Sequence, residues 1–220
     1  MQPESLNNNK WYKMWKDAQS PLTREVDPNY RDQFAKEMLI LIGDVAGKKV
    51  LEFGCGNGLL FENYGFDKSD YLGVDFSDSM LSVFKSNYPK VRLQQSLAED
   101  FKINEKFDLI FSCGLIQYLT PNQLSTHISN MKNMLNSKGK IILAAIPWKT
   151  AKLSCLRNDH GTRRSILELI KLHLKGNSIN RMGYWHSIRT FKKFAKKNNL
   201  NYTVYGSLHY HYRIHVVLTR

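Results

Sequence analysis

The 220-residue chain has little of what disulfide-rich or membrane-spanning proteins depend on. Its three cysteines, Cys55, Cys113 and Cys155, are odd in number and widely spaced, which favours neither a disulfide framework nor a zinc site. No run of about 18 apolar residues occurs, so we expect no membrane-spanning helix. The first residues lack the basic and apolar segments of a signal peptide. These absences predict a protein of a reducing compartment, and we expect it in the cytoplasm.

Acidic residues are scarce in only one part of the chain. Residues 1–148 hold 17 basic and 17 acidic residues, whereas residues 149–220 hold 15 basic and 2 acidic ones. The formal net charge of +13 therefore comes from the last third. Such a charge excess indicates either a solvated surface or a face that attracts an anionic partner, and the sequence favours the two about equally.

The most informative segment, residues 50–58, reads Val-Leu-Glu-Phe-Gly-Cys-Gly-Asn-Gly. It predicts a buried strand that runs into a glycine-rich turn, followed by a helix from about Leu59. Such a turn can offer backbone N–H groups and the positive end of a helix dipole to an anionic ligand group. The NAD fingerprint would need its third glycine where Leu59 stands. The segment therefore predicts a nucleotide-like ligand other than NAD.

A second acidic strand end lies about 20 residues further on, where residues 71–75 predict a short apolar strand that finishes at Asp75. Doubly wound nucleotide sites place a carboxylate for the ribose hydroxyls at this spacing. Asp75 could alternatively only cap the helix that begins near Ser77. The combination with the glycine turn favours the ribose-binding interpretation.

With Glu52 in front of its glycines, the turn reads E-x-G-x-G-x-G and resembles motif I of the class I S-adenosylmethionine-dependent methyltransferases. Residues 97–101 resemble the family's acidic segment at the adenine, although Leu97 stands where the family often has Asp. This leaves the adenine amino group to Glu99 or to backbone alone. Residues 106–112 resemble motif IV, whose end lies beside the methyl donor. The cofactor-binding residues that the resemblance implies are Glu52, Gly54, Cys55, Gly56, Asn57, Gly58, Asp75, Phe76, Met80, Leu97, Ala98, Glu99, Ser112, Cys113 and Gln117.

The order of the expected elements predicts an α/β fold. It is a doubly wound, mostly parallel sheet with helices on both faces. The short Gly206-Ser207 connection predicts a final hairpin, so that the last strand runs antiparallel, as in the family's seven-stranded sheet. The expected helices are 29–46, 58–64, about 78 onward, 120–135 and 188–198, and the expected strands are 50–53, 71–75, 91–95, 106–112, 140–146, 201–205 and 210–218.

The resemblance also implies how the chain is divided. Residues 1–46 are expected to form an N-terminal helical segment that docks on the core or closes over the cofactor as a lid. Residues 47–220 are expected to form the methyltransferase domain, with an acceptor-side insertion at about 147–186. Helical spacing at residues 166–173 of the insertion favours a cap on the domain over a basic helix on a membrane surface.

The reaction implied is methyl transfer from S-adenosylmethionine to a small or medium-sized polar acceptor. We expect O-methylation, for instance of a sugar or another anionic metabolite. Since a hydroxyl is a weak nucleophile, we predict His186 as the general base, with His160 and His211 as alternatives. His209, His211 and His215 share one face of a strand by their even spacing, but no acid or cysteine stands close by, so no metal is predicted.

Two other functions stay open from the sequence. The basic last third would suit an RNA methyltransferase, although the Asn/Asp-Pro-Pro-aromatic motif of base-amine methylases is replaced by Cys113-Gly114-Leu115. A protein that binds the cofactor or a nucleotide without catalysis is the other alternative. Contact with a membrane surface is a further hypothesis for the insertion.

Overall fold

The computed structural model describes residues 28–155 and 183–220. Residues 1–27 of the expected N-terminal lid, His160 and the helical stripe at 166–173 lie outside these residues. Among the described residues, no helix is both long and apolar enough to cross a membrane.

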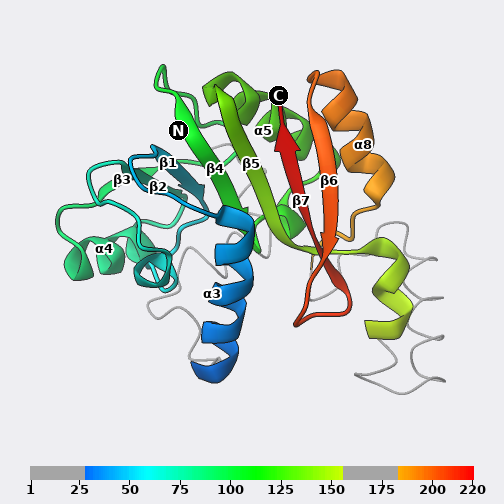
Figure 1. Cartoon of the computed structure of the whole chain (residues 1–220), viewed down its shortest axis with the longest axis horizontal. Coiled ribbons are helices and arrows are strands. Elements are labelled where there is room, and N and C mark those ends of the chain that lie inside the picture. The colour runs from blue at the N-terminus through cyan, green and yellow to red at the C-terminus, as the bar shows by residue number, and fades with distance from the viewer. Residues whose placement is uncertain (1–27, 156–182) are drawn as a thin grey trace.

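The core is one seven-stranded sheet in the order β3-β2-β1-β4-β5-β7-β6 (Figure 1). The first strands pair in parallel, and β7 runs antiparallel to both of its neighbours, β5 and β6. This confirms the doubly wound fold with its antiparallel last strand. The strands are β1 (Val50–Phe53), β2 (Tyr71–Asp75), β3 (Arg92–Gln95), β4 (Phe107–Cys113), β5 (Leu135–Pro147), β6 (Asn201–Gly206) and β7 (Arg213–Thr219).

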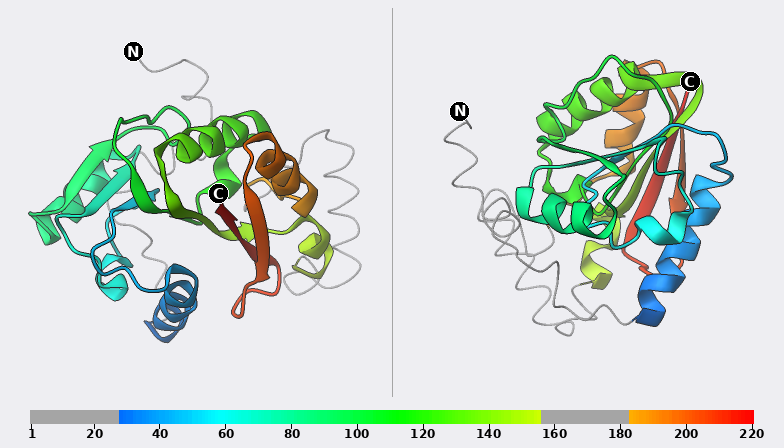
Figure 2. Two further views of the ribbon diagram at one scale, coloured as in Figure 1. Left: turned by 45° about the horizontal axis from the view of Figure 1, so that its top comes forward. Right: turned by 90° about the vertical axis from the view of Figure 1, so that its left-hand side faces the viewer.

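Helices cover both faces of the sheet, with α5 and α8 on one side and α3 on the other (Figure 2). Alternate residues of a strand belong to two different hydrophobic cores, one on each face of the sheet, because successive side chains of a strand point to opposite faces. Leu51 and Ile110 pack with α5 and α8, whereas Leu109 and Phe111 pack with α3 and α4. The α-helices are α3 (Pro28–Ile42), α4 (Asp78–Asn87), α5 (Pro121–Met134) and α8 (Ile188–Lys197), and the 3₁₀ turns are η1 (Phe61–Tyr64), η2 (Ile116–Tyr118) and η3 (Lys149–Ala151).

Three sequence predictions of local structure are wrong. The helix expected at 58–64 is the four-residue 3₁₀ turn η1, which ends at the left-handed Gly65. The first helix ends at Ile42 rather than near residue 46, because Gly43 adopts a positive φ of 67°. The fifth strand begins at Leu135 instead of Lys140, and its pairing with β4 shifts register between Phe107 and Leu109.

The expected row of histidines is also wrong, since His209 and His211 lie in the connection between β6 and β7 and only His215 lies on the strand. His209 contacts the backbone oxygen of Gln33, and His215 is buried beside Glu37. No cluster of His, Cys, Asp or Glu side chains suited to a metal occurs in the described ranges.

Polar caps begin the helices where the sequence predicts them. Ser77 and Ser187 cap α4 and α8. Thr120 forms a capping box at α5, accepting from the backbone N–H of Gln123 while the Gln123 side chain accepts from the Thr120 N–H. This cap fixes the direction in which the chain leaves β4 and η2.

We expect Thr120→Ala to lower the free energy of unfolding by about 1 kcal/mol, because it removes one of the two hydrogen bonds of the box. Urea denaturation of the variant measures this loss. Thr126→Ala is the matched control, since Thr126 is exposed in the middle of the same helix. An equal or larger loss in the control would contradict the assignment of the cap.

Candidate functional site

A cavity of about 380 Å³ opens at the edge of the sheet where the parallel strands end. Ligands of open α/β sheets bind at this edge. The volume lies within the usual range for small-molecule sites. The cavity is lined by Phe34, Glu52, Gly54, Cys55, Gly56, Asn57, Leu59, Leu60, Phe61, Val74, Asp75, Phe76, Ser77, Met80, Ser96, Ala98, Cys113, Gly114, Leu115, Gln117, Tyr118, Ala145, Tyr210 and Arg213.

Asp75 joins three elements at the cavity wall. One carboxylate oxygen accepts from the backbone N–H of Gly56 at 2.9 Å, and the other accepts from that of Ser77 at 2.9 Å. Burial raises the pKa of Asp75, while these backbone hydrogen bonds oppose the rise. Each oxygen keeps a second lone pair, so the carboxylate can still accept from two ribose hydroxyls. The helix cap itself is Ser77, so Asp75 is not merely a capping residue.

Glu52 is a buried acid on the same wall. Its carboxylate accepts from the Tyr71 hydroxyl at 2.6 Å. Burial raises the pKa of Glu52 to about 7, although the bond from Tyr71 lowers it, and the nearby charge of Asp75 adds to the rise. A cation bound in the cavity would favour the ionised form of this group.

The glycine turn works differently from the sequence prediction. The backbone N–H groups of Gly54, Gly56 and Gly58 already have protein acceptors: Val74, Asp75 and Cys55 respectively. No α-helix begins behind the turn either, since η1 is only a short 3₁₀ turn. The expected helix-dipole site is therefore wrong, and the carboxyl groups of Glu52 and Asp75 dominate this wall.

Gly58 serves packing instead of lining the cavity. Its φ of 76° is rarely accessible to other residues, and a Cβ there would stand 2.4 Å from the Phe84 ring of α4. Only glycine therefore allows the turn to pack on this helix.

The adenine and motif IV segments are divided between the cavity and the core. Ala98 lines the cavity, but Leu97 does not, and the Glu99 side chain instead accepts from Gln123 at the start of α5. Cys113 and Gln117 line the cavity, while Ser112 is fully buried beside it. Burial raises the pKa of the Cys113 thiol to about 12, so this group stays protonated.

His186 is not among the lining residues. Its ring is buried, its Nε2 lies 3.1 Å from the Ile116 backbone oxygen, and burial lowers its pKa. The segment around it still borders the site, because the Tyr184 N–H donates to the backbone oxygen of Gln117 at 2.7 Å. The catalytic role of His186 stays a prediction, and the described geometry gives it no direct access to the cavity.

The sequence reasoning missed several lining residues. Ser96 follows directly after β3, so the rule that ligands meet strand ends could have found it. Tyr210 lies in the connection between β6 and β7, and Arg213 is the first residue of the antiparallel β7, which returns to the same edge. Phe34 of α3 carries no local signal, because only tertiary packing brings it there.

Comparison with known proteins finds a similar family. A family model described as "Methyltransferase domain" matches residues 50–139, from β1 into β5. This segment holds the glycine turn and Asp75, on which the resemblance to the class I S-adenosylmethionine-dependent methyltransferases rests. A ubiquinone biosynthesis O-methyltransferase of Glaesserella parasuis is 34% identical over 116 residues, which cover 48% of this chain and 48% of that protein. The chain spans about half the length of the curated relatives that it matches.

Solved structures show the same fold. The structure titled "DhpI-SAM-HEP complex" superposes with a TM-score of 0.69 at 12% identity, over 100% of both chains. Magnesium protoporphyrin IX methyltransferase from Synechocystis PCC 6803, solved with bound SAH, gives a TM-score of 0.62 at 18% identity, over 96% of this chain and 93% of that one.

S-adenosylmethionine fits the residues around the cavity of this chain. Asp75 offers acceptors for the ribose, and Glu52 offers negative charge to the cationic methionine portion. Phe76, Met80 and Ala98 supply apolar wall beside these two acids. The donor set of the cavity therefore suits an adenosine that carries a cation.

The raised pKa of Glu52 predicts a pH-dependent stability. Between about pH 4.5 and about 7 the folded state keeps a proton that the unfolded state releases, so ionisation opposes folding as the pH rises through this range. We expect Glu52→Gln to remove a penalty of up to roughly 3 kcal/mol at high pH. The melting temperature of Glu52→Gln minus that of the wild type should therefore be larger at about pH 8 than at about pH 5.

Glu62→Gln is the control, because Glu62 is an exposed glutamate on η1. This variant removes an exposed carboxylate outside the cavity and gives the reference melting temperature at each pH. Parallel melting curves for Glu52→Gln and the wild type would show that Glu52 is not held in its neutral form.

Proposed function

We propose that this chain transfers the methyl group of S-adenosylmethionine to a small or medium-sized polar acceptor. The observation that carries the proposal is the single cavity wall on which Glu52, the glycine turn and Asp75 meet at the carboxyl ends of β1 and β2. When bound, the cofactor supplies a methyl group activated by its sulfonium. The chain's own residues then serve mainly to orient two ligands, which is the principal requirement of an in-line displacement.

An oxygen acceptor is part of the proposal. The names of several curated relatives specify O-methyltransferases, and this supports O-methylation here. That the acceptor is a sugar or another anionic metabolite stays a prediction from the sequence. None of the lining residues in the described ranges is a histidine. His186 can therefore act as the proposed base only if the segment around it moves so that its ring faces the cavity.

The proposal also includes a division of the chain into two parts. Residues 1–46 are the N-terminal segment and residues 47–220 the catalytic domain, with the acceptor-side insertion at 147–186. The contact of Tyr184 with Gln117 supports placing the end of this insertion beside the acceptor. Cytoplasmic location and contact with a membrane surface stay predictions.

Asp75→Ala should weaken S-adenosylhomocysteine binding at least roughly tenfold, because a buried acceptor for the ribose is lost. Isothermal titration calorimetry measures this change, with NAD as the competing ligand. Asp78→Ala is the matched control, since Asp78 is exposed in the first turn of α4 and does not line the cavity. NAD binding without binding of the homocysteine product would overturn the proposal.

An acceptor screen tests methyl transfer itself. Sugars, nucleotide sugars, phenols and RNA are offered to the full chain, and formation of S-adenosylhomocysteine is measured. We expect turnover with a small hydroxyl compound. Turnover with RNA alone, with binding that weakens steeply as salt rises, would favour the RNA alternative. Tight cofactor binding without turnover of any acceptor would favour a non-catalytic protein.

A further inference from the structure

Arg213 places a positive charge in the cavity, opposite in sign to Glu52 and Asp75. It is the first residue of β7 and lines the cavity, because the antiparallel strand begins where β4 and β5 end. Its Nη1 donates to the side-chain oxygen of Gln117 at 3.0 Å and to the backbone oxygen of Ala145. The guanidinium is thus fixed beside Gln117 of the motif IV loop and Ala145 of β5.

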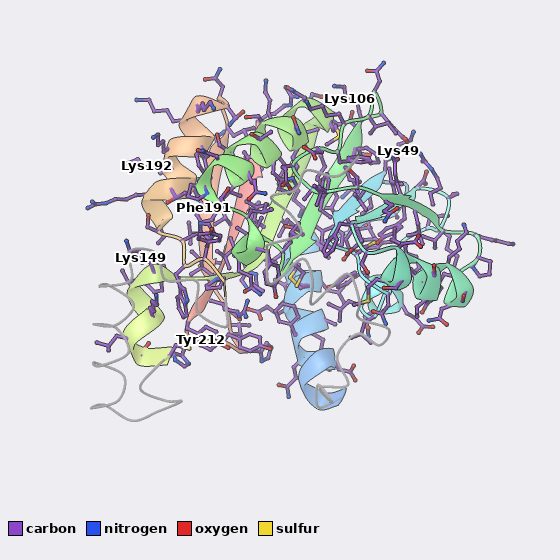
Figure 3. All side chains as sticks on the ribbon, turned by 180° about the vertical axis from the view of Figure 1, so that it is seen from behind. Lys49, Lys106, Lys149, Phe191, Lys192 and Tyr212 are labelled. Atoms are coloured by element: carbon purple, nitrogen blue, oxygen red, sulfur yellow. The ribbon has the colours of Figure 1, made fainter. Side chains whose placement is uncertain are left out.

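Two tyrosines hold the guanidinium from the side. Its central carbon lies 5.3 Å from the ring centre of Tyr210 and 5.5 Å from that of Tyr212. The two rings meet edge to face at 5.6 Å. Figure 3 shows Tyr212 beside the first residue of β7. Lys49 and Lys106 lie at the opposite end of the sheet, where the parallel strands β1 and β4 begin. Aromatic faces stabilise a cation without neutralising it.

Within residues 28–155 and 183–220, the charge of Arg213 has no carboxylate partner. None of the ion pairs between described residues includes it. Its Nε is buried and has no hydrogen-bond acceptor in the described parts of the chain. A buried N–H without an acceptor is costly, and rare enough to call for an explanation. The Nε side of a guanidinium is one of the edges that binds carboxylate or phosphate oxygens through two parallel hydrogen bonds.

The backbone behind Arg213 is strained in a way that fixes this arrangement. Ala145 has a φ of 57° at a register shift between β5 and β7, which directs its carbonyl to Arg213. Its N–H donates to His215 Nδ1 at 3.4 Å, and His215 Nε2 donates to Glu37 of α3 at 3.1 Å. Strain of this kind persists only where the surroundings hold it, and it concentrates at functional sites.

We propose that Arg213, clamped by Tyr210 and Tyr212, binds a carboxylate or phosphate group of the methyl acceptor and so determines acceptor specificity. The inference rests on the proposed function, because it assigns the second substrate of that cavity. The carboxylate of the methionine portion of the donor is the competing occupant. Among the described residues, the hydrogen bonds of Arg213 reach Gln117 and Ala145 and no residue of the turn after β1, which favours the acceptor.

The test titrates the full chain, saturated with S-adenosylhomocysteine, with benzoate, phenyl phosphate and the neutral isostere benzamide. We expect at least one of the anions to bind more tightly than benzamide. Arg213→Met should remove this preference, a loss of roughly ten- to hundredfold in affinity for the anion. Affinity for S-adenosylhomocysteine should stay within a few fold.

Arg189→Met is the matched control, because it removes the same charge from an exposed position on α8. It should leave the anion preference unchanged. If Arg213→Met does not fold, Arg213→Lys replaces it, and the anion should still bind several-fold more weakly because an ammonium lacks the fork geometry.

Three results would overturn the inference. They are no anion preference in the wild type, an unchanged anion preference in the Arg213 variants, or Arg213 variants that lose affinity for S-adenosylhomocysteine instead of for the anion. The last result would assign Arg213 to the donor carboxylate. Failure of the proposed function is distinguishable, because the wild type would then not bind S-adenosylhomocysteine at all.

Discussion

The site depends on one carboxylate that holds two turns together. Asp75 ends β2 and accepts from Gly56 in the turn after β1 and from Ser77 at the start of α4. Because β1 and β2 run parallel and in register, their ends already lie side by side, and the carboxylate locks the loops that follow them. Glu52 and Cys55 lie on the wall that this lock shapes. The same group that organises this wall also offers acceptors to a ribose, so folding and binding use one side chain.

The sequence predicts well the features that local chemistry determines. Hydrophobic runs of period two and three to four, the caps at Ser77 and Ser187, and the strand that ends at Asp75 all carry their own signals. Together they predict the sheet, its order of elements and much of the cofactor wall.

The rest is set by tertiary contacts that no short segment encodes. Gly58 is needed because of the Phe84 ring, which lies on another element, and η1 stays short because Gly65 ends it. The left-handed Ala145 depends on β7 shifting its register against β5. Arg213 reaches the cavity only because β7 runs antiparallel and begins at this edge of the sheet. From the sequence alone, Arg213 is therefore one of many basic residues in the last third and is not recognised as a site residue.

The basic residues that the structure describes in the last third include two physically different kinds. Along α8 the basic side chains Arg189, Lys192, Lys193, Lys196 and Lys197 accompany a face whose Phe191 and Phe194 are buried, an arrangement that makes the helix amphipathic. Solvent and salt screen such charges, so they say little about a ligand. Arg213 is the single Lys or Arg among the lining residues that the structure describes, and in a partly buried place its charge is screened far less. One shielded cation therefore determines which acceptors can enter more strongly than the large surface excess does.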